Sequence, residues 1–346
     1  MKPLLLPLCF LLFSLQVQAA DELDQLGRFE ISEFALSPRL GLQEPGQGGF
    51  ELSQSWIGFE WRRDELVRGV LKLGSSDLNA PAIWNSPEVR PSFGVSEAWM
   101  EGRSGFGDMR AGLLSIPQAF EGLSPDWSAV LPETRARRKS WFIKRDFGLQ
   151  LNWATKKWET SVTVHNGESA ENKDGQYWVT SHWQYKTPGG SGVLVTGSVG
   201  QTKSESTLTS LAGLAENRFV FDRTEKAKIR QGSVALFREQ RRNLLLLEAG
   251  RGEILQKEEK NSFFWAHLDA VWNWGSDASL LFRYELNQPD QKDSKSMLKS
   301  PGLGVSYSSK DNLQSLTAFY SRLEEDPEVP SDEFWLIFRI HSLFAK

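Results

Sequence analysis

The chain consists mainly of short segments in which apolar and polar residues alternate, separated by turn residues. In one of them, Phe147, Leu149, Leu151 and Trp153 alternate with polar residues or glycine. Successive side chains of a β-strand point to opposite faces, so each such segment predicts a strand with one apolar face and one polar face. The pattern predicts about sixteen strands, at 29–36, 50–61, 66–74, 93–103, 108–115, 141–153, 158–166, 176–186, 193–202, 229–237, 244–250, 263–274, 280–286, 302–307, 313–322 and 334–344.

The connections between these segments alternate between short and long. Polar turns such as 62–65 and 187–190 alternate along the chain with long stretches such as 37–49, 117–140 and 203–228. Short turns at one end and long loops at the other are typical of outer-membrane barrels, with the turns in the periplasm and the loops outside the cell. A soluble β-sandwich also has short strands, but it has no reason to separate loop lengths in this way. We therefore expect an all-β fold, a transmembrane antiparallel β-barrel.

The final segment, 334–344, has the length of a tilted strand that crosses a bilayer, which needs about 9–11 residues. Phe334, Leu336 and Phe338 share one face, and Arg339 and His341 lie on the other. Pairing of this strand with the first would leave the sheet without an edge, as a β-structure in lipid requires.

The N-terminus predicts an export signal. A charged Lys2 precedes an apolar run from Leu4 to Leu15, and Ala19 and Ala20 offer a small-residue cleavage site. We expect residues 1–20 to be removed and residues 21–346 to form the barrel in the outer membrane. The single cysteine, Cys9, lies within this signal.

The net charge and the aromatic residues exclude some classes of function but do not identify one. The formal net charge of −4, about −5 without Lys2, argues against a nucleic-acid partner. Aromatic residues on the apolar faces predict interfacial girdles; these are Trp141, Trp153, Trp158, Tyr177, Trp183, Trp272, Trp274, Tyr284, Tyr307 and Tyr320. Trp99, Trp178 and Trp265 fall on the lumen side instead, where they would suit a carbohydrate channel.

The same alternation places charged residues on the inner wall, where water solvates them and their free-energy cost is small. The predicted pore-lining residues are Arg68, Lys72, Glu97, Glu101, Arg110, Asp146 and Arg283. Because both signs occur, we expect at most weak charge selectivity; the alternative is a salt-bridged lining that selects nothing.

The long segment 117–140 follows the fifth predicted strand and is a candidate for a constriction loop folded into the barrel. Its cationic cluster would line the constriction: Arg135, Arg137, Arg138 and Lys139. Alternatively, these cations pair with Glu121, Asp126 and Glu133, or face lipopolysaccharide phosphates.

Several stretches, taken in order, resemble the phosphate-selective porin O/P family. They are EAWME at 97–101, MRAGL at 109–113 with Pro117 after it, RDFGLQ at 145–150, NGE at 166–168 followed by Asn172 and Asp174, and the ending FRIH at 338–341. The resemblance implies a sixteen-stranded porin, commonly a homotrimer. The loops look shorter than in that family and Lys and Arg are not in surplus, so the resemblance implies a porin rather than phosphate selectivity.

We therefore expect a passive porin for small hydrophilic solutes or ions, in contact with outer-membrane lipid and lipopolysaccharide, with no cofactor and no enzymatic activity. Two alternatives stay open, a non-conducting structural or adhesive barrel and, less favoured, a barrel hydrolase. A hydrolase would need a histidine beside a serine or an aspartate. The four histidines, His165, His182, His267 and His341, are scattered on the lumen side without metal-ligand spacing.

Overall fold

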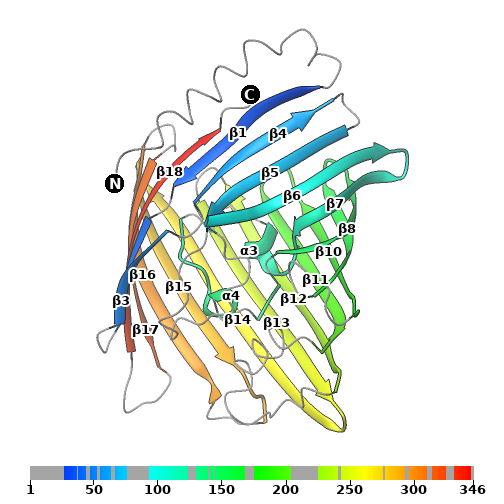
Figure 1. Cartoon of the computed structure of the whole chain (residues 1–346). Helices are drawn as coiled ribbons and strands as arrows, with labels where there is room; N and C mark the ends of the chain where they lie inside the picture. Colours follow the sequence, from blue (N-terminus) through cyan, green and yellow to red (C-terminus); the bar gives the residue numbers. More distant parts are fainter. Residues whose placement is uncertain are drawn as a thin grey trace, which may run out of the picture.

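The computed structural model describes residues 27–36, 38–43, 47–52, 55–63, 67–75, 93–123, 130–138, 141–143, 145–167, 175–203, 225–240, 243–275, 277–292, 296–309, 314–324 and 331–343. Nearly all of them belong to one antiparallel sheet that curls into a barrel (Figure 1). The predicted signal at 1–20 and Lys139 lie outside this part of the chain.

The sheet contains eighteen strand segments. They are β1 (Arg28–Leu36), β2 (Pro38–Gln43), β3 (Gln47–Leu52), β4 (Trp56–Arg62), β5 (Val67–Ser75), β6 (Phe93–Ser104), β7 (Gly107–Ser115), β8 (Arg145–Ala154), β9 (Trp158–His165), β10 (Trp178–Lys186), β11 (Ser191–Thr202), β12 (Ala227–Gln240), β13 (Asn243–Gln256), β14 (Glu259–Trp274), β15 (Ala278–Gln288), β16 (Leu298–Ser308), β17 (Gln314–Leu323) and β18 (Ser331–Leu343).

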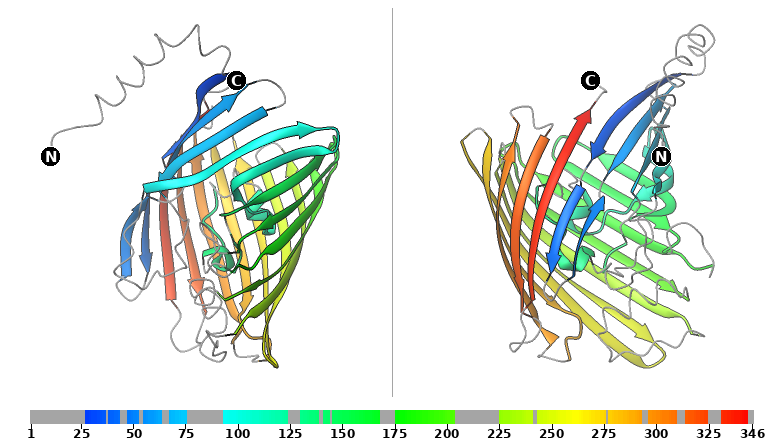
Figure 2. Two further views of the ribbon diagram at one scale, coloured as in Figure 1. Left: turned by 45° about the vertical axis from the view of Figure 1, so that its right-hand side comes forward. Right: turned by 60° about the vertical axis from the view of Figure 1, so that its left-hand side comes forward.

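The first four segments make only two wall strands. Both β1 and β2 pair with β18, and they pair on their other side with β4 and β3, respectively. The eighteen segments therefore form a closed barrel of sixteen strands, which confirms the predicted fold class. The seam is the antiparallel pairing of β1 with β18, with Leu36 opposite Ile340 (Figure 2).

The predicted loop at 37–49 is wrong in its extent. Residues 38–43 and 47–52 continue the hairpin as β2 and β3, so that little of this stretch is a connection. The prediction weighed the prolines and glycines of this stretch above its alternation. Pro38 stands at the first position of β2, where a strand tolerates the missing N–H.

The connections differ in length between the two ends of the barrel. At the short-turn end they are 63–66, 105–106, 155–157, 187–190, 241–242, 275–277 and 309–313. At the long-loop end they are 44–46, 76–92, 116–144, 166–177, 203–226, 257–258, 289–297 and 324–330. Two of these connections, 44–46 and 257–258, are as short as the turns. The strands that 257–258 joins, β13 and β14, are correspondingly long. The turn at 187–190 uses Gly190 with φ of +78°, where a Cβ atom would collide with the Glu239 carbonyl.

Each strand presents an apolar face outward and a mixed face inward. On β13, Leu245 and Leu247 are about half exposed on the outside, whereas Leu246 and Glu248 are buried on the inside. None of the helices among the described residues is long and apolar enough to cross a membrane.

The outward aromatics follow the prediction with one exception. Exposed rings include Trp153, Trp158, Tyr177, Trp183, Trp272, Trp274, Tyr307 and Tyr320. Trp141 is instead buried and meets Phe263 edge to face at 5.6 Å. The prediction for Trp141 is wrong because β8 begins only at Arg145, and residue 141 belongs to a segment that packs on the inner wall.

Candidate functional site

The segment that joins β7 to β8 lies inside the barrel (Figures 1 and 2). We call its described residues, within 116–143, the inner loop. It contains two short helices, α3 (Ala119–Leu123) and α4 (Arg135–Arg138). Its backbone does not follow the neighbouring strands, so its N–H and C=O groups are hydrogen-bonded within the loop, as from the Trp141 N–H to the Ala136 carbonyl at 2.9 Å, or to side chains of the opposite wall.

A first anchor joins the start of the inner loop to β10–β13. The backbone N–H of Phe120 donates to the carboxylate of Glu248 at 3.0 Å, and the Ser233 hydroxyl donates to the same carboxylate at 2.6 Å. The amide of Gln118 donates to the Thr180 hydroxyl at 3.3 Å and accepts from the Gln231 amide at 3.1 Å. The inner loop therefore supplies hydrogen-bond partners to Thr180, Gln231 and Glu248 of the wall.

A second anchor joins the end of the inner loop to β14 and β15. Arg283 donates two hydrogen bonds of 2.6 Å to Asp269 and a third to the carbonyl of Pro132. Glu121 lies 3.5 Å from the same guanidinium group. The backbone N–H of Arg135 donates to Glu285 at 2.7 Å. The buried Arg283 therefore holds the loop and the wall together.

Apolar contacts fill the space between these anchors. Phe120 packs against Phe237 with ring centroids 5.2 Å apart, and Phe142 meets Trp265 at 4.9 Å. Trp178, another inward aromatic, is buried in the same cluster as Phe142. The inner loop thus covers the inner face of β10–β15, and those two tryptophans pack rather than line an aqueous path.

The inner face of β4–β7 has a different character because several of its arginine side chains remain accessible. Arg28, Arg62 and Arg68 are successive partners across β1, β4 and β5, and Glu101 and Arg110 continue the same row on β6 and β7. Directly paired residues lie on the same face of a sheet. We call the four arginines the arginine row.

Ion pairs hold the arginine row against the wall in a particular order. Arg62 and Arg68 share Glu60, with an Arg68–Glu60 distance of 2.7 Å, and Arg110 lies 2.5 Å from Glu101. The side chains of Arg62, Arg68 and Arg110 are 55%, 38% and 34% exposed, against 4% and 6% for the two glutamates. The carboxylates are covered and the guanidinium groups face the bore.

Two tryptophans support the cations. The guanidinium groups of Arg110 and Arg68 lie 4.7 and 5.4 Å from the ring centre of Trp99, and the Lys72 ammonium group lies 5.6 Å from that of Trp56. These are cation–π distances, and such contacts fix otherwise mobile side chains. Lys72 also lies 3.6 Å from Glu97.

The predicted pore-lining residues fall into two groups. Arg68, Lys72, Glu97, Glu101 and Arg110 lie on the accessible wall of β5–β7. Asp146 and Arg283 also lie on the inner side, but both are buried, Arg283 beneath the inner loop.

The predicted constriction residues are not one exposed cluster. Arg135 is buried, and Arg137 lies 3.3 Å from Glu133, the pairing that the alternative interpretation named. Nothing is described of the Arg138 side chain or of Lys139.

Sequence reasoning missed Arg28, Arg62 and Glu60. The alternation that places Arg68 inward extends across the turn to Arg62 and Glu60, but the turn residues concealed it. The anchors Gln118 and Glu248 carried no sequence signal, because their partners are 62 and 128 residues away.

A hydrogen-bonded chain of side chains runs through β8–β11. His165 contacts Asp146 through Nδ1 at 2.7 Å and Thr180 through Nε2 at 2.9 Å, and Thr180 contacts Ser198 at 2.8 Å. Asp146, His165 and Thr180 are at most 1% exposed. The order acid, imidazole, hydroxyl is that of a nucleophile chain, here closed to solvent.

Solved structures with the same fold are membrane barrels. The chain superposes on an anion-selective porin from Comamonas acidovorans with a TM-score of 0.65 and 9% identity, over 91% of this chain and 100% of that one. An outer membrane protein, OmpT, of Vibrio cholerae gives 0.65 and 10% over 91% and 98%, and one of its structures is a trimer form. The outer membrane channel DcaP of Acinetobacter baumannii gives 0.57 and 9% over 91% and 96%.

These identities establish the likeness of fold alone. No protein-family model and no curated protein matches the sequence. The resemblance to the phosphate-selective porin O/P family therefore stays a prediction.

Proposed function

We propose that the protein is a porin-type channel of the outer membrane, through which small hydrophilic solutes diffuse passively. The observation that carries this proposal is the contrast between the two halves of the inner wall. The inner loop covers β10–β15, whereas the guanidinium groups of Arg62, Arg68 and Arg110 on β4, β5 and β7 stay accessible. A barrel of about sixteen strands is wide enough to leave an aqueous path beside such a loop.

We further propose a mild preference for anions. The arginine row carries four cations, and the carboxylates beside it are those of Glu30, Glu60 and Glu101. Glu60 and Glu101 are nearly covered, whereas Arg62, Arg68 and Arg110 remain accessible. A solute at this wall therefore meets guanidinium groups first. Rings of arginine are one means by which pores select anions.

Single-channel recording tests both parts of the proposal. The refolded protein in planar bilayers should open in steps, and its reversal potential in a salt gradient should indicate anion preference. Arg68→Gln combined with Arg110→Gln should move the permeability ratio toward unity. The matched control is Arg238→Gln, an exposed arginine at the short-turn end of β12, which should leave the ratio unchanged.

Two results would contradict the proposal. Folded protein that leaves the bilayer silent would favour the non-conducting structural or adhesive barrel. Conduction with a ratio that is the same in the wild type and in the double variant would remove the arginine row from selectivity.

For assembly we propose a homotrimer in the outer membrane, reached through the predicted signal. The trimer form of the Vibrio cholerae protein with this fold supports that choice. The mass of the purified protein in detergent, measured by light scattering with the detergent contribution subtracted, should be three times 39.1 kDa less the signal. A single-chain mass would refute the trimer without touching the channel proposal.

A second candidate function, hydrolysis, rests on two buried arrangements, the Asp146–His165–Thr180 chain and the 2.7 Å contact between Ser161 and His182. The Thr180 hydroxyl is already engaged by Gln118 and Ser198, and no substrate reaches a buried oxygen. We expect this series of hydrogen-bonded side chains to stabilise the packing of β8–β11 beneath the inner loop. Peptide or phospholipid hydrolysis that Thr180→Val abolishes without unfolding the barrel would establish the enzyme instead.

A further inference from the structure

Charged side chains break the apolar outer face of the barrel near the long-loop end of β12–β14. Lys228 and Arg230 on β12, Arg251 on β13 and Lys260 on β14 all point outward and are exposed. Among the outward-facing described residues of these three strands the acidic neighbour is Glu253, which is paired directly with Arg230, lines the same hollow, and lies 2.6 Å from Lys260 and 3.6 Å from Arg251. Four cations against one carboxylate leave this patch strongly positive.

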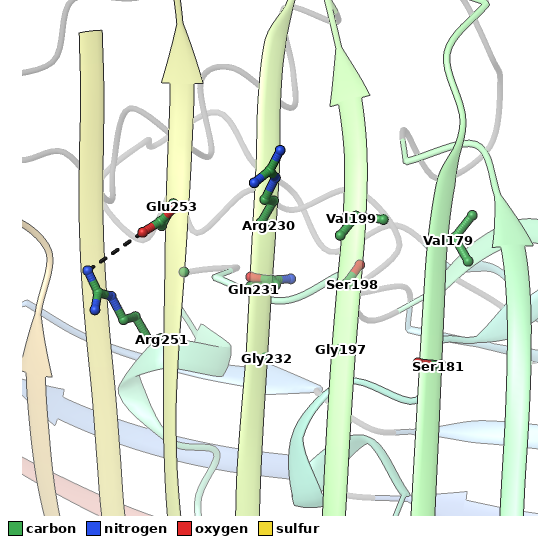
Figure 3. Close-up of a pocket in the computed structure, with 11 residues that line it drawn as sticks. Val179, Ser181, Gly197, Ser198, Val199, Arg230, Gln231, Gly232, Arg251 and Glu253 are labelled. Carbon is green, nitrogen blue, oxygen red and sulfur yellow. Dashed lines mark ion pairs between the residues drawn. The ribbon is translucent and has the colours of Figure 1, made fainter.

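A hollow of about 560 Å³ opens beside these cations on the outer wall (Figure 3). The residues directly paired across β10, β11 and β12 at its floor are Ser181, Gly197 and Gly232, which have little or no side chain. Val179 and Val199 border it above, and Arg230 and Arg251 lie at its β12–β13 side. The trough is therefore apolar along its length and cationic at one end.

The patch lies near the height of the lipid head groups. Arg230 is ten residues from Gln240 at the short-turn end of β12, and Arg251 is eight residues from Asn243 on β13. At about 3.3 Å per residue and a tilt of about 40°, these separations rise roughly 25 and 20 Å along the membrane normal. The apolar band of such barrels is about 25 Å tall, so Arg230 reaches its upper boundary and Arg251 lies about 5 Å below it. Cations on the lipid face are costly at mid-depth and cheap near this boundary.

We propose that this outer-wall hollow binds an anionic, phosphate-bearing acyl lipid of the outer leaflet. The phosphate lies between Arg230 and Arg251, with Lys228 and Lys260 adding to the positive field, and an acyl chain lies across Gly197 and Gly232. A guanidinium group offers paired N–H donors that match the oxygens of a phosphate group. The valine side chains that border the hollow offer no such donors. The site takes a lipid rather than a free anion because its greater part is an apolar trough.

Native mass spectrometry of the full chain in neutral detergent tests this site. The probe is bis-phosphorylated lipid A, with its dephosphorylated counterpart and inorganic phosphate as comparisons. We expect one lipid A per barrel, at least tenfold weaker binding by Arg230→Gln/Arg251→Gln, and near wild-type binding by Arg230→Lys/Arg251→Lys. Gly197→Leu, whose Cβ would have only the Ser181 hydroxyl within 4 Å, should fill the trough and weaken lipid binding severalfold. Arg238→Gln is the control that leaves the site intact.

Three outcomes would overturn the proposal. They are equal binding of the dephosphorylated lipid, unchanged binding by the double glutamine variant, and absence of lipid together with self-association that the same variant abolishes, which would make this face an interface between copies. Retention of the heat-resistant folded form on gels shows whether each variant has folded. Binding is measured in micelles without current, so its failure is separate from failure of the channel proposal.

Discussion

At the scale of the residue, the character of the bore depends on which member of each ion pair is covered. Glu60 and Glu101 are nearly inaccessible, whereas Arg62, Arg68 and Arg110 remain open to the interior. On the opposite side, Arg283 is itself covered and serves the inner loop. The same residue type therefore faces the bore at one position and fixes a loop at another.

Arg283→Met should loosen the second anchor. The change leaves Asp269 and Glu121 buried without their cation, and removing one partner of a buried pair costs about 3–5 kcal/mol. We expect faster proteolysis within the inner loop and noisier, larger conductance steps, measured by limited digestion of folded protein and by bilayer recording. Arg238→Met is the control, and equal digestion rates for the two variants would contradict this role of Arg283.

Sequence alternation predicted the side of the wall on which these residues lie, but not their exposure. The inward positions of Arg68 and Arg110 follow from the strand period alone. The burial of Asp146 and Arg283 depends on the inner loop and on His165, which are distant in sequence. The two-residue alternation along a strand predicts which face of the sheet a side chain lies on. It does not predict which other segments cover that face.

At the scale of the element, the inner loop is the feature that makes the bore asymmetric. It contacts β10–β15 by hydrogen bonds through Gln118, Phe120, Pro132 and Arg135 and by packing through Phe120, Trp141 and Phe142. Its position inside the barrel was a sequence hypothesis from length and place after the fifth strand. Trp141 was misplaced because an apolar residue packed on an inner wall has the same sequence appearance as one that faces lipid.

Replacing residues 119–138 by a short Gly-Ser linker should widen the conducting path. The described inner loop fills one side of the bore, so its removal should raise single-channel conductance at least twofold and lower the unfolding temperature, because the inner aromatics lose their cover. Conductance and heat-modified gel mobility check the two effects. An unchanged conductance would mean that the loop does not limit flow.

The glycines of β13 provide a further prediction at the level of the strand. A Cβ at Gly252 would lie 2.0 Å from the ring of Phe263, so the aromatic side chain of β14 lies flat over a bare backbone. Gly252→Val should therefore lower the unfolding temperature measurably, since the inner ring must move against the loop. Gly102→Val is the matched control, because a Cβ there would have nothing within 4 Å. Equal unfolding temperatures would show that the ring has room to move.

At the scale of the whole molecule, closure and the outward apolar band were predictable because they are imposed by the solvent. A sheet in lipid cannot have a free edge, and every strand must turn the same kind of face outward. The number of strands followed from the number of segments in which apolar and polar residues alternate. The strands β2 and β3 were missed because proline and glycine obscured a continuation that pairing with β18 stabilises.

Leu336→Arg tests the assignment of the outer face. Leu336 points outward near the middle of β18, where an arginine facing lipid costs about 2–4 kcal/mol. We expect a corresponding loss of folding into lipid vesicles, followed by the fraction of heat-modifiable protein. Ser191→Arg, at the short-turn end of β11, should fold almost as well as the wild type. Equal folding yields for both variants would contradict the orientation of β18.

The seam between β1 and β18 has a consequence for how the protein is made. It joins residues as far apart in the chain as Glu33 and Leu343, so the last strand to be synthesised supplies the partner of the first. The cylinder cannot shut until β18 is present to pair with β1, and until then the unpaired margin of β1 is open to any other extended polypeptide.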